Sequence, residues 1–224
     1  SLSVEAKTIN IVSSSSADCE DGYRFVEIYK SGITKDGWEY DIIKEQNINT
    51  DEYKFFAAIG SYKGTATTVT LPTNVLKYYD GSLRDSSTVK KAIIPNSNTK
   101  IQISNSFFWG SSTLEEVTIG SAVKNVYTSM FESDTKLKTV NFTKEFLAQK
   151  PYIGSRAFAK CTSLRKLVLP NGISGIADDA LVGCKNLNTI TFGESIQACP
   201  ITTDNVNLTN IKLLRKKVTQ EIIL

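Results

Sequence analysis

The chain contains no histidine among its 224 residues, and it has only one methionine and two tryptophans. Histidine is the commonest general base and the commonest neutral metal ligand, so its absence lowers the expectation of catalysis. No nucleophile elbow, phosphate-binding loop, dinucleotide fingerprint or zinc motif is present either. We therefore expect a protein that is not an enzyme and that carries neither a metal nor another cofactor.

Two further absences concern location and charge. No apolar run of about 18 residues occurs, so the sequence predicts no membrane span. The chain begins SLSVEAKTIN, without a basic segment followed by an apolar one, so no signal sequence is present in the chain as given. The net charge of +3 is small and spread along the chain, which does not favour nucleic acid as a partner.

The four cysteines show no C-x-x-C spacing, so the sequence does not predict a zinc site. Cys161 and Cys184 occupy the same place in consecutive copies of the repeat described below. Two stacked, buried small side chains are the simpler interpretation, because free cysteine is among the most buried residue types. The alternative is a disulfide bond between neighbouring coils, which would imply an oxidising compartment.

What the sequence does contain is a repeat between Leu114 and Leu208. The leucines that open successive copies stand 23, 27 and 23 residues apart: Leu114, Leu137, Leu164 and Leu187. Five residues after each of them comes a second apolar residue: Ile119, Phe142, Leu169 and Phe192. Six residues before each comes a third: Phe108, Phe131, Phe158 and Leu181. A fixed period of this length indicates a solenoid, in which each short unit buries its apolar face only against its neighbours.

The predicted fold class is an α/β solenoid dominated by strands, with about six units of about 23 residues over residues 59–213. In the clearest unit, Leu167 and Leu169 alternate with outward residues, which is typical of a strand with one buried face. The Pro170-Asn171-Gly172 turn ends that strand, and residues 178–182 fit one 3₁₀ or helical turn. We expect equivalent side chains from consecutive coils to share one interior. A parallel β-helix is the competing architecture.

Residues 1–58 do not follow the repeat. Two runs of alternating aromatic and β-branched residues, 23–29 and 38–43, flank the turn sequence SGITKDG and predict a β-hairpin. We expect this region to be a cap over the first coil, because the open end of a solenoid needs cover. The alternative is a small binding module that uses the aromatic side chains of Trp38, Tyr40 and Tyr23.

Two charged groups near the chain ends have simple interpretations. Asp18, Glu20 and Asp21 lack the spacing of a calcium-binding loop and predict a solvated loop. Residues 214–224 form a C-terminal tail after the last incomplete unit, and the basic run at their start predicts a charged final turn or strand: Lys212, Arg215, Lys216 and Lys217.

The segment 153–192 resembles the BspA-like leucine-rich repeat family. The motif of that family falls on the following residues: Ile153, Ala157, Phe158, Cys161, Leu164, Leu167, Leu169 and Pro170. A second copy runs from Ile176 to Phe192, and the resemblance as a whole covers residues 59–213. Gly120 and Gly193 replace the strand-ending proline, and Ser133 or Asp134 stands where a cysteine is expected.

The resemblance implies a right-handed leucine-rich repeat superhelix with short 3₁₀ or helical turns and an N-terminal β-hairpin cap. It also implies a bacterial protein that is secreted or exposed on the cell surface and that acts in adhesion or partner binding. The family brings no catalytic residue to carry over. The expected location is therefore extracellular or at the cell surface.

The predicted contact area is the outward face of the repeat sheet. Residues between the inward ones project from successive strands at intervals of about 4.8 Å, and such extended faces are where repeat proteins usually bind. The face is mixed in charge and rich in threonine, which suits a protein partner, such as a host or surface protein, better than sugar stacking. The alternative function is a glycan-binding accessory module that uses the N-terminal aromatics. The predicted partner-binding residues are Lys91, Ile93, Glu116, Thr118, Thr139, Asn141, Lys166, Val168, Thr189 and Thr191.

Overall fold

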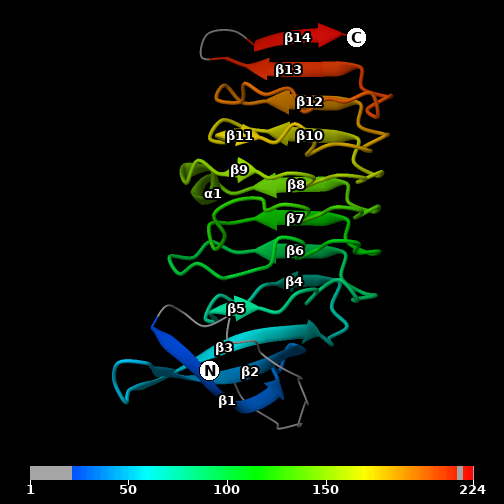
Figure 1. Cartoon of the computed structure of the whole chain (residues 1–224). Helices are drawn as coiled ribbons and strands as arrows, with labels where there is room; N and C mark the ends of the chain where they lie inside the picture. Colours follow the sequence, from blue (N-terminus) through cyan, green and yellow to red (C-terminus); the bar gives the residue numbers. More distant parts are fainter. Residues whose placement is uncertain (1–21, 216–218, 224) are drawn as a thin grey trace.

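The computed structural model describes residues 22–215 and 219–223, which form one stack of coils with a small sheet at one end (Figure 1). The predictions that fall on Asp18, Cys19, Glu20, Asp21, Lys216 and Lys217 lie outside the described residues. The end sheet contains three long strands: β1 (Tyr23–Ile33), β2 (Trp38–Asn47) and β3 (Tyr53–Tyr62).

The coils contribute one short strand each to the front of the stack. These strands are β4 (Thr68–Thr70), β6 (Lys91–Ile94), β7 (Glu116–Ile119), β8 (Thr139–Phe142), β10 (Lys166–Leu169), β12 (Thr189–Phe192) and β13 (Asn210–Leu214). Within each of two groups, β4 to β8 and β10 to β13, neighbouring front strands pair in parallel, and their registers follow the sequence repeat, as Leu167 opposite Ile190 opposite Ile211 illustrates. The predicted strand-dominated solenoid and its repeat register are confirmed.

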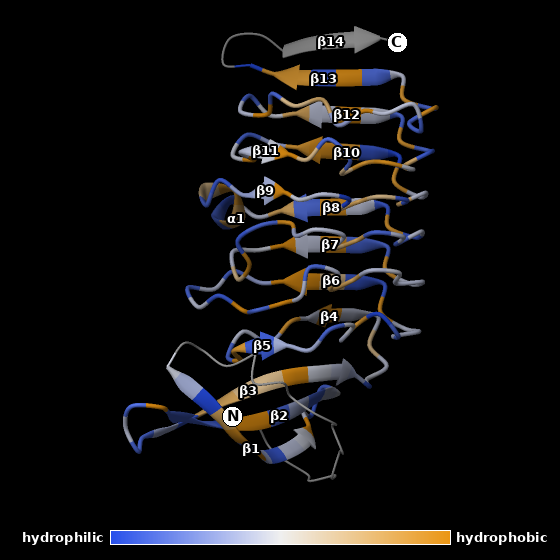
Figure 2. Cartoon of the chain, viewed as in Figure 1, coloured by the Kyte–Doolittle hydropathy of each residue, from blue (hydrophilic) through white to orange (hydrophobic). Residues whose placement is uncertain are grey.

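Strand alternation separates the interior from the front surface. In β10, Leu167 and Leu169 are buried whereas Lys166 and Val168 are exposed. The same alternation of half-buried and buried residues occurs in β6 and β7, and Figure 2 shows hydrophilic and hydrophobic residues within the same front strands. Short strands suffice because each coil needs only two inward residues before its turn.

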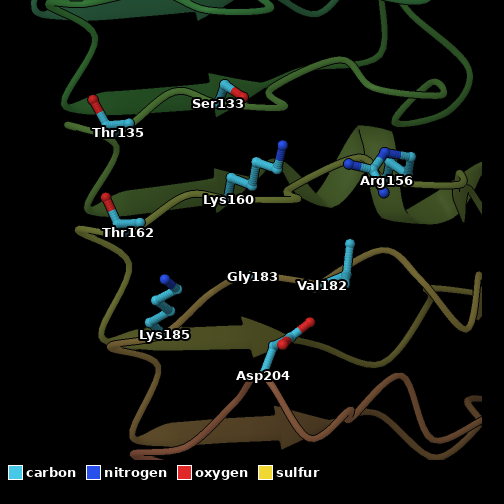
Figure 3. Close-up of a pocket in the computed structure, with 9 residues that line it drawn as sticks. All are labelled: Ser133, Thr135, Arg156, Lys160, Thr162, Val182, Gly183, Lys185 and Asp204. Atoms are coloured by element: carbon cyan, nitrogen blue, oxygen red, sulfur yellow. The ribbon is translucent and has the colours of Figure 1, made fainter.

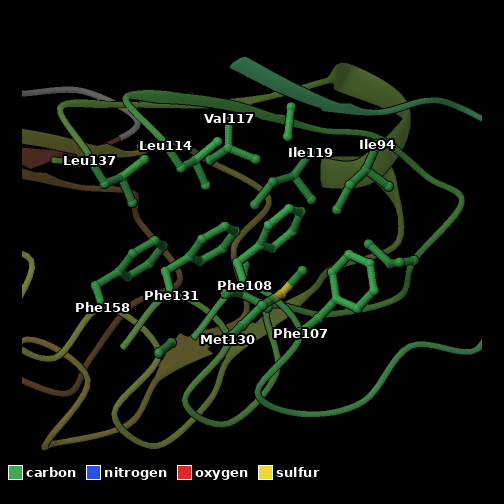
Figure 4. Packing of buried hydrophobic residues seen from close by; sticks show 14 of the residues in the cluster. Ile94, Phe107, Phe108, Leu114, Val117, Ile119, Met130, Phe131, Leu137 and Phe158 are labelled. Carbon is green, nitrogen blue, oxygen red and sulfur yellow. The ribbon is translucent and has the colours of Figure 1, made fainter. Parts of the chain in front are cut away.

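The interior is a continuous column of side chains from successive coils (Figure 4). The rings of Phe108 and Phe131 stack with centroids 5.1 Å apart, and those of Phe131 and Phe158 stack at 5.4 Å with only 3° between their planes. Leu181, in the equivalent position of the next coil, is fully buried in the same cluster. Equivalent side chains therefore share one interior, as the sequence predicts.

Two front strands, β7 and β12, are followed by glycine in place of proline for a steric reason. A Cβ atom built on Gly193 would lie 2.5 Å from the carbonyl oxygen of Pro170 in the preceding coil. A Cβ atom built on Gly120 would lie equally close to backbone atoms of Ile94 and Pro95. No side chain fits at that separation, so the two departures from the proline motif are positions where neighbouring coils come closest.

The back of each coil is built mainly from turns. Ala180 and Val182 donate their N–H groups to residues three positions earlier, which is the bonding pattern of a 3₁₀ turn. Short strands join some coils at the back: β5 (Lys77–Tyr78) pairs with β3, and β9 (Tyr152–Ile153) pairs with β11 (Gly175–Ile176). The single helix in the described residues is α1 (Lys144–Ala148). It belongs to the coil between Leu137 and Leu164, which is four residues longer than its neighbours. The Thr143 side chain caps the helix by accepting a hydrogen bond from the Phe146 N–H at 3.1 Å.

The front face is divided by a seam. The strands β4, β6, β7 and β8 form one sheet, and β10, β12 and β13 belong to a second. No backbone hydrogen bond joins β8 to β10 within the described residues, although the coils that carry them remain bonded elsewhere, as in Phe131 N–H to Ala157 O at 2.9 Å. The seam coincides with the coil that carries the insertion and α1.

The N-terminal region contributes three antiparallel strands to a four-stranded sheet, and the predicted hairpin is its β1–β2 pair. Its third strand, β3, runs across the predicted boundary at residue 58 and pairs in parallel with β5 of the first coil. Trp38 is buried against the rings of Tyr62 and Tyr78, at centroid distances of 4.9 and 6.0 Å. This sheet covers the apolar end of the column. The division of the chain at residue 58 stays a prediction.

The last coil ends in a hairpin. The strand β13 continues to Leu214, and β14 (Thr219–Ile223) returns antiparallel to it, with Asn210 opposite Ile223. Residues placed in the predicted C-terminal tail therefore add one antiparallel strand to the second front sheet.

Cys161 and Cys184 are free and fully buried, so the simpler interpretation of these residues is confirmed. Their thiols donate to Phe131 O and Phe158 O of the preceding coils, at 3.1 and 3.0 Å. Burial raises the pKa of the Cys161 thiol well above its usual value and that of Cys184 to about 12. Both sulfurs therefore act as packing atoms that also bond one coil to the next.

We predict that Phe158→Ala lowers the free energy of unfolding by about 3–5 kcal/mol, because it empties a slot shared by two neighbouring coils. Chemical denaturation measures this loss. Tyr152→Ala is the control: its side chain is exposed, so the change should cost less than about 1 kcal/mol. Equal stability of the two variants would contradict the shared interior.

Candidate interaction surface

The outward row predicted from the sequence lies on the front face, on strands of both sheets. Thr139, Asn141, Lys166 and Val168 are exposed, and they flank the seam between β8 and β10. Five residues of the row are half-buried: Lys91, Ile93, Glu116, Thr118 and Thr189. The most accessible part of the predicted contact area is therefore its middle.

The half-buried charges of the front face pair with one another. The Lys91 ammonium lies 2.8 Å from the Glu116 carboxylate, and the Asn141 amide donates to the same carboxylate at 3.3 Å. These three side chains come from β6, β7 and β8, so they form a ladder across the first sheet. Such pairing stabilises the orientation of the side chains. It leaves β6 and β7 with little unpaired charge that a binding partner could contact.

Thr191 is the one residue of the predicted row that is buried, with 7% of its surface exposed. The expectation that the whole row faces solvent is wrong at this position. The register places Thr191 between Val168 of β10 and Lys212 of β13. Paired strands therefore flank Thr191 on both sides, and Lys212 carries a longer side chain than threonine.

A hollow of about 500 Å³ opens beside the front face, at the turns that precede the strands. Figure 3 shows its residues in rows across consecutive coils: Thr135, Thr162 and Lys185 in one row, and Ser133, Lys160 and Gly183 in the next. A second hollow of about 330 Å³ shares Thr162 and reaches the front strands at Lys166. We call the two hollows together the basic groove, after the cations that line it: Lys138, Arg156, Lys160, Arg165, Lys166 and Lys185.

Two of these cations are paired within the protein. The Arg156 guanidinium lies 2.7 Å from the Glu132 carboxylate, and their hydrogen bond lowers the pKa of Glu132 and raises that of Arg156. The Lys138 ammonium lies 3.1 Å from Glu115, and its hydrogen bond lowers the pKa of that carboxyl. Both pairs hold their cations at the edges of the groove.

A buried carboxyl lies directly behind the wall of the groove. Asp134 stands between two lining residues and has no exposed surface. Its Oδ1 accepts the Ser111 N–H at 2.8 Å, while its Oδ2 has no hydrogen-bond partner. Burial raises the pKa of Asp134 to about 9, against the opposing effect of the Ser111 and Gly110 N–H groups. The carboxyl is therefore protonated and neutral at pH 7.

Asp134 belongs to a column of small polar residues, one from each coil. Cys161, Cys184 and Asn205 fill the equivalent positions and donate to carbonyl oxygens of the preceding coil, with the Asn205 amide reaching Leu181 O at 3.0 Å. An ionised aspartate would be the one member of this column without a donor. This explains why the protonated form suits the site.

The N-terminal aromatics of the alternative glycan hypothesis are not arranged as a binding site. Trp38 and Tyr40 have only 1% and 2% of their surfaces exposed, so neither ring can stack on a sugar. Tyr23 is half-buried, and its ring is covered by the Lys54 ammonium at 3.8 Å. The prediction that these three side chains are available to a ligand is wrong for Trp38 and Tyr40, because both pack against the end of the column.

Two features were missed in the sequence. The exposed aromatics of the N-terminal sheet are Tyr29, Tyr53 and Phe55, with the rings of Tyr29 and Phe55 in edge contact at 5.1 Å. The basic groove was missed as well. Its signal is present in the repeat register, which places Lys138 and Arg165 at one position of adjacent coils and Thr162 and Lys185 at another.

Two kinds of site find no support in the described part of the chain. No group of three or more metal-ligating side chains comes together there. Helices in the same residues are all too short or too polar to cross a bilayer.

The comparison that decides the family concerns the repeat itself. Six copies of the BspA type leucine rich repeat region match residues 45–152 and 145–220. The chain belongs to the BspA-type leucine-rich repeat family. The six copies agree with the about six units predicted from the sequence, and they settle the choice against a parallel β-helix. A comparison with curated protein sequences gives no significant match.

Solved structures show the same fold. A leucine-rich repeat protein from Bacteroides ovatus is 24% identical, with a TM-score of 0.56, over 66% of this BspA-type chain and 37% of its own. The leucine-rich repeat protein of T. pallidum is 19% identical, with a TM-score of 0.57, over 82% of this chain and 78% of its own. A leucine-rich repeat protein from Eubacterium ventriosum is 20% identical, with a TM-score of 0.53, over 79% of this chain and 48% of its own. The chain thus spans less than half of the first and third of these proteins.

We predict that Asp134→Asn stabilises the protein, and increasingly so as the pH rises from about 4 to about 9. The unfolded chain loses its proton near pH 3.8 and the folded one near pH 9, so between these values the folded state holds an extra proton and loses stability with rising pH. Asparagine removes this pH dependence and supplies an N–H donor. We expect it to raise the free energy of unfolding by roughly 2–4 kcal/mol at pH 8. Thermal melts of both proteins across this pH range measure the difference.

Asp178→Asn is the matched control, because Asp178 is exposed on the back of a coil. It should leave the pH dependence of the melting temperature as in the unmodified protein. A constant offset between Asp134→Asn and the unmodified protein at all pH values would contradict the protonated state of Asp134.

Proposed function

We propose that the chain is a non-enzymatic interaction module of a secreted or cell-surface protein, and that it binds a protein partner through the front face of the solenoid. Membership of the BspA-type family supports this role, together with the surface location that the resemblance implies. The observation that carries the proposal is the exposed middle of the front face, where Thr139, Asn141, Lys166 and Val168 present side chains from adjacent coils. Adhesion to a host or bacterial surface protein is the specific activity we propose.

The composition of this area supports a protein partner. Threonine and asparagine offer hydrogen bonds, Lys166 offers charge, and Val168 is an exposed apolar side chain with 39% of its surface accessible. No aromatic ring belongs to the predicted row, so stacking on a sugar has no support there. Extended faces of this kind are the usual contact areas of repeat proteins.

The test uses purified host-matrix and bacterial surface proteins in a binding panel. We expect at least one to bind the chain, and we expect Thr139→Arg with Asn141→Arg to weaken that binding about tenfold or more, because two bulky cations would clash with a docked surface. Surface plasmon resonance measures the dissociation constants, and thermal melts show whether each variant is folded.

The matched control carries Asn74→Arg and Asn98→Arg, which add the same charge at exposed positions in connecting turns. This variant should bind as the unmodified chain does. Equal weakening of both double variants would assign the effect to net charge, and the proposal would then fail, as it would if no protein of the panel bound.

A further inference from the structure

Cations outnumber carboxylates along the basic groove. Lys160, Arg165, Lys166 and Lys185 are all exposed, and no ion pair within the described residues involves their side chains. Three of the four belong to one coil, in which residues 156–166 include no acidic residue. Asp204 stands at the far end of the groove as the one lining carboxylate.

We propose that the basic groove binds the carboxylates of an extended acidic segment in the protein partner. This inference rests on the proposed function, because it takes the partner to be a protein, and it adds the chemistry by which that partner is recognised. The groove meets the front face at Lys166, so one partner can contact both surfaces.

Two residues of the groove occupy left-handed turn positions that are glycines in other coils. Lys160 and Ser133 adopt the left-handed conformation, with φ of 59° and 64°, where the equivalent positions of two other coils are glycines, Gly110 and Gly183. A lysine in this conformation is disfavoured relative to glycine. Of the five non-glycine residues with positive φ in the described part of the chain, three line the groove: Ser133, Arg156 and Lys160. The left-handed turn recurs in successive coils, and in the coils of Ser133 and Lys160 a side chain occupies the position that is glycine in the coils of Gly110 and Gly183.

Neighbouring residues leave room for the lysine. A Cβ atom built on Gly183 would lie 3.0 Å from Cγ of Lys160, so the glycine makes space for the lysine stem as it crosses the next coil. In Figure 3 the Lys160 side chain extends between the rows of Thr162 and Arg156. Its ammonium group is thus directed into the hollow.

The smaller hollow of the groove lies at the seam. Because β8 and β10 share no backbone hydrogen bond, the coils on either side are not held together along the front. Lys138 belongs to the coil on one side, and Arg165 and Lys166 belong to the coil on the other. The insertion that interrupts the sheet therefore also brings together cations from two coils around one opening.

The lining chemistry favours a carboxylate-bearing peptide. The cations are mainly lysines, which bind anions as flexible point charges, and hydroxyl groups such as that of Thr162 stand between them. No aromatic ring lines the groove, so nucleobases and neutral sugars lack a stacking surface. An extended peptide places alternate side chains on one side about 6.6–6.8 Å apart, a spacing that long lysine side chains on consecutive coils can follow.

The experiment measures the binding of a fluorescein-labelled oligoglutamate peptide by fluorescence anisotropy. We expect the unmodified chain to bind it, and we expect the affinity to fall as salt is added. The triple variant Lys160→Gln, Arg165→Gln and Lys166→Gln should bind at least about tenfold more weakly. The control variant Lys30→Gln, Lys35→Gln and Lys63→Gln removes the same charge from exposed positions of the N-terminal sheet and should bind as the unmodified chain does.

Lys160→Gly separates binding from folding. Glycine relieves the left-handed strain, so the melting temperature should stay unchanged or rise while the affinity for oligoglutamate falls. A folded Lys160→Gly variant with full affinity would overturn the role of Lys160 and the proposal with it. The proposal would also be overturned if the two triple variants lost affinity equally, or if the unmodified chain ignored oligoglutamate.

A sulfated polysaccharide serves as the competing probe. Binding of the polysaccharide without binding of oligoglutamate would overturn the peptide proposal and assign the groove to anionic glycans. The Thr139 and Asn141 arginine variant distinguishes this failure from failure of the proposed function. If the arginine variant no longer binds the protein partner while the triple glutamine variant still does, the front face binds protein and the groove does not.

Discussion

The structure depends on the bonding of each coil to the next at a fixed register. Backbone hydrogen bonds join equivalent residues at the front strands, at the turns beside them and in places at the back, and the side chains follow the same register into the core. A coil of this size has too few inward residues to bury an apolar core alone. The stacked rings of Phe108, Phe131 and Phe158 show how three coils share what none could form separately.

This constraint divides the sequence into two kinds of positions. Neighbouring coils on both sides restrict the inward positions. Position 193 has room only for glycine. Asp134 is kept neutral at a position where other coils have cysteine or asparagine. Outward positions and turns are free of that requirement. The same coil can therefore keep Leu164, Leu167 and Leu169 in register while it carries four cations on its surface.

Much of the fold could be predicted from the sequence because the leucine register reports directly on burial. The register identified the front strands, the common interior and the buried cysteines before any coordinates. It gave less information about the N-terminal sheet, where Trp38 was expected to be either a cap residue or a ligand contact. Aromatic residues on a strand serve both purposes, and only the position of the solenoid end decides that Trp38 is buried.

The candidate site was harder to predict for two physical reasons. Alternation along a strand says which way a side chain points, but the exposure of Thr191 also depends on what surrounds it on β10 and β13. The basic groove depends on the seam, which arises when an insertion in one connection separates two strands. The insertion was visible in the 27-residue spacing, but its effect on the pairing of β8 with β10 was not.

The seam also leaves one junction of the solenoid without strand pairing along the front. Between β4 and β13 it is the only described junction that lacks hydrogen bonds along the front, while the turns and the bridge from Val126 to Ile153 keep the adjacent coils joined elsewhere. Bending that opens the front at this point breaks no strand pairing, whereas the same bend at any neighbouring junction does.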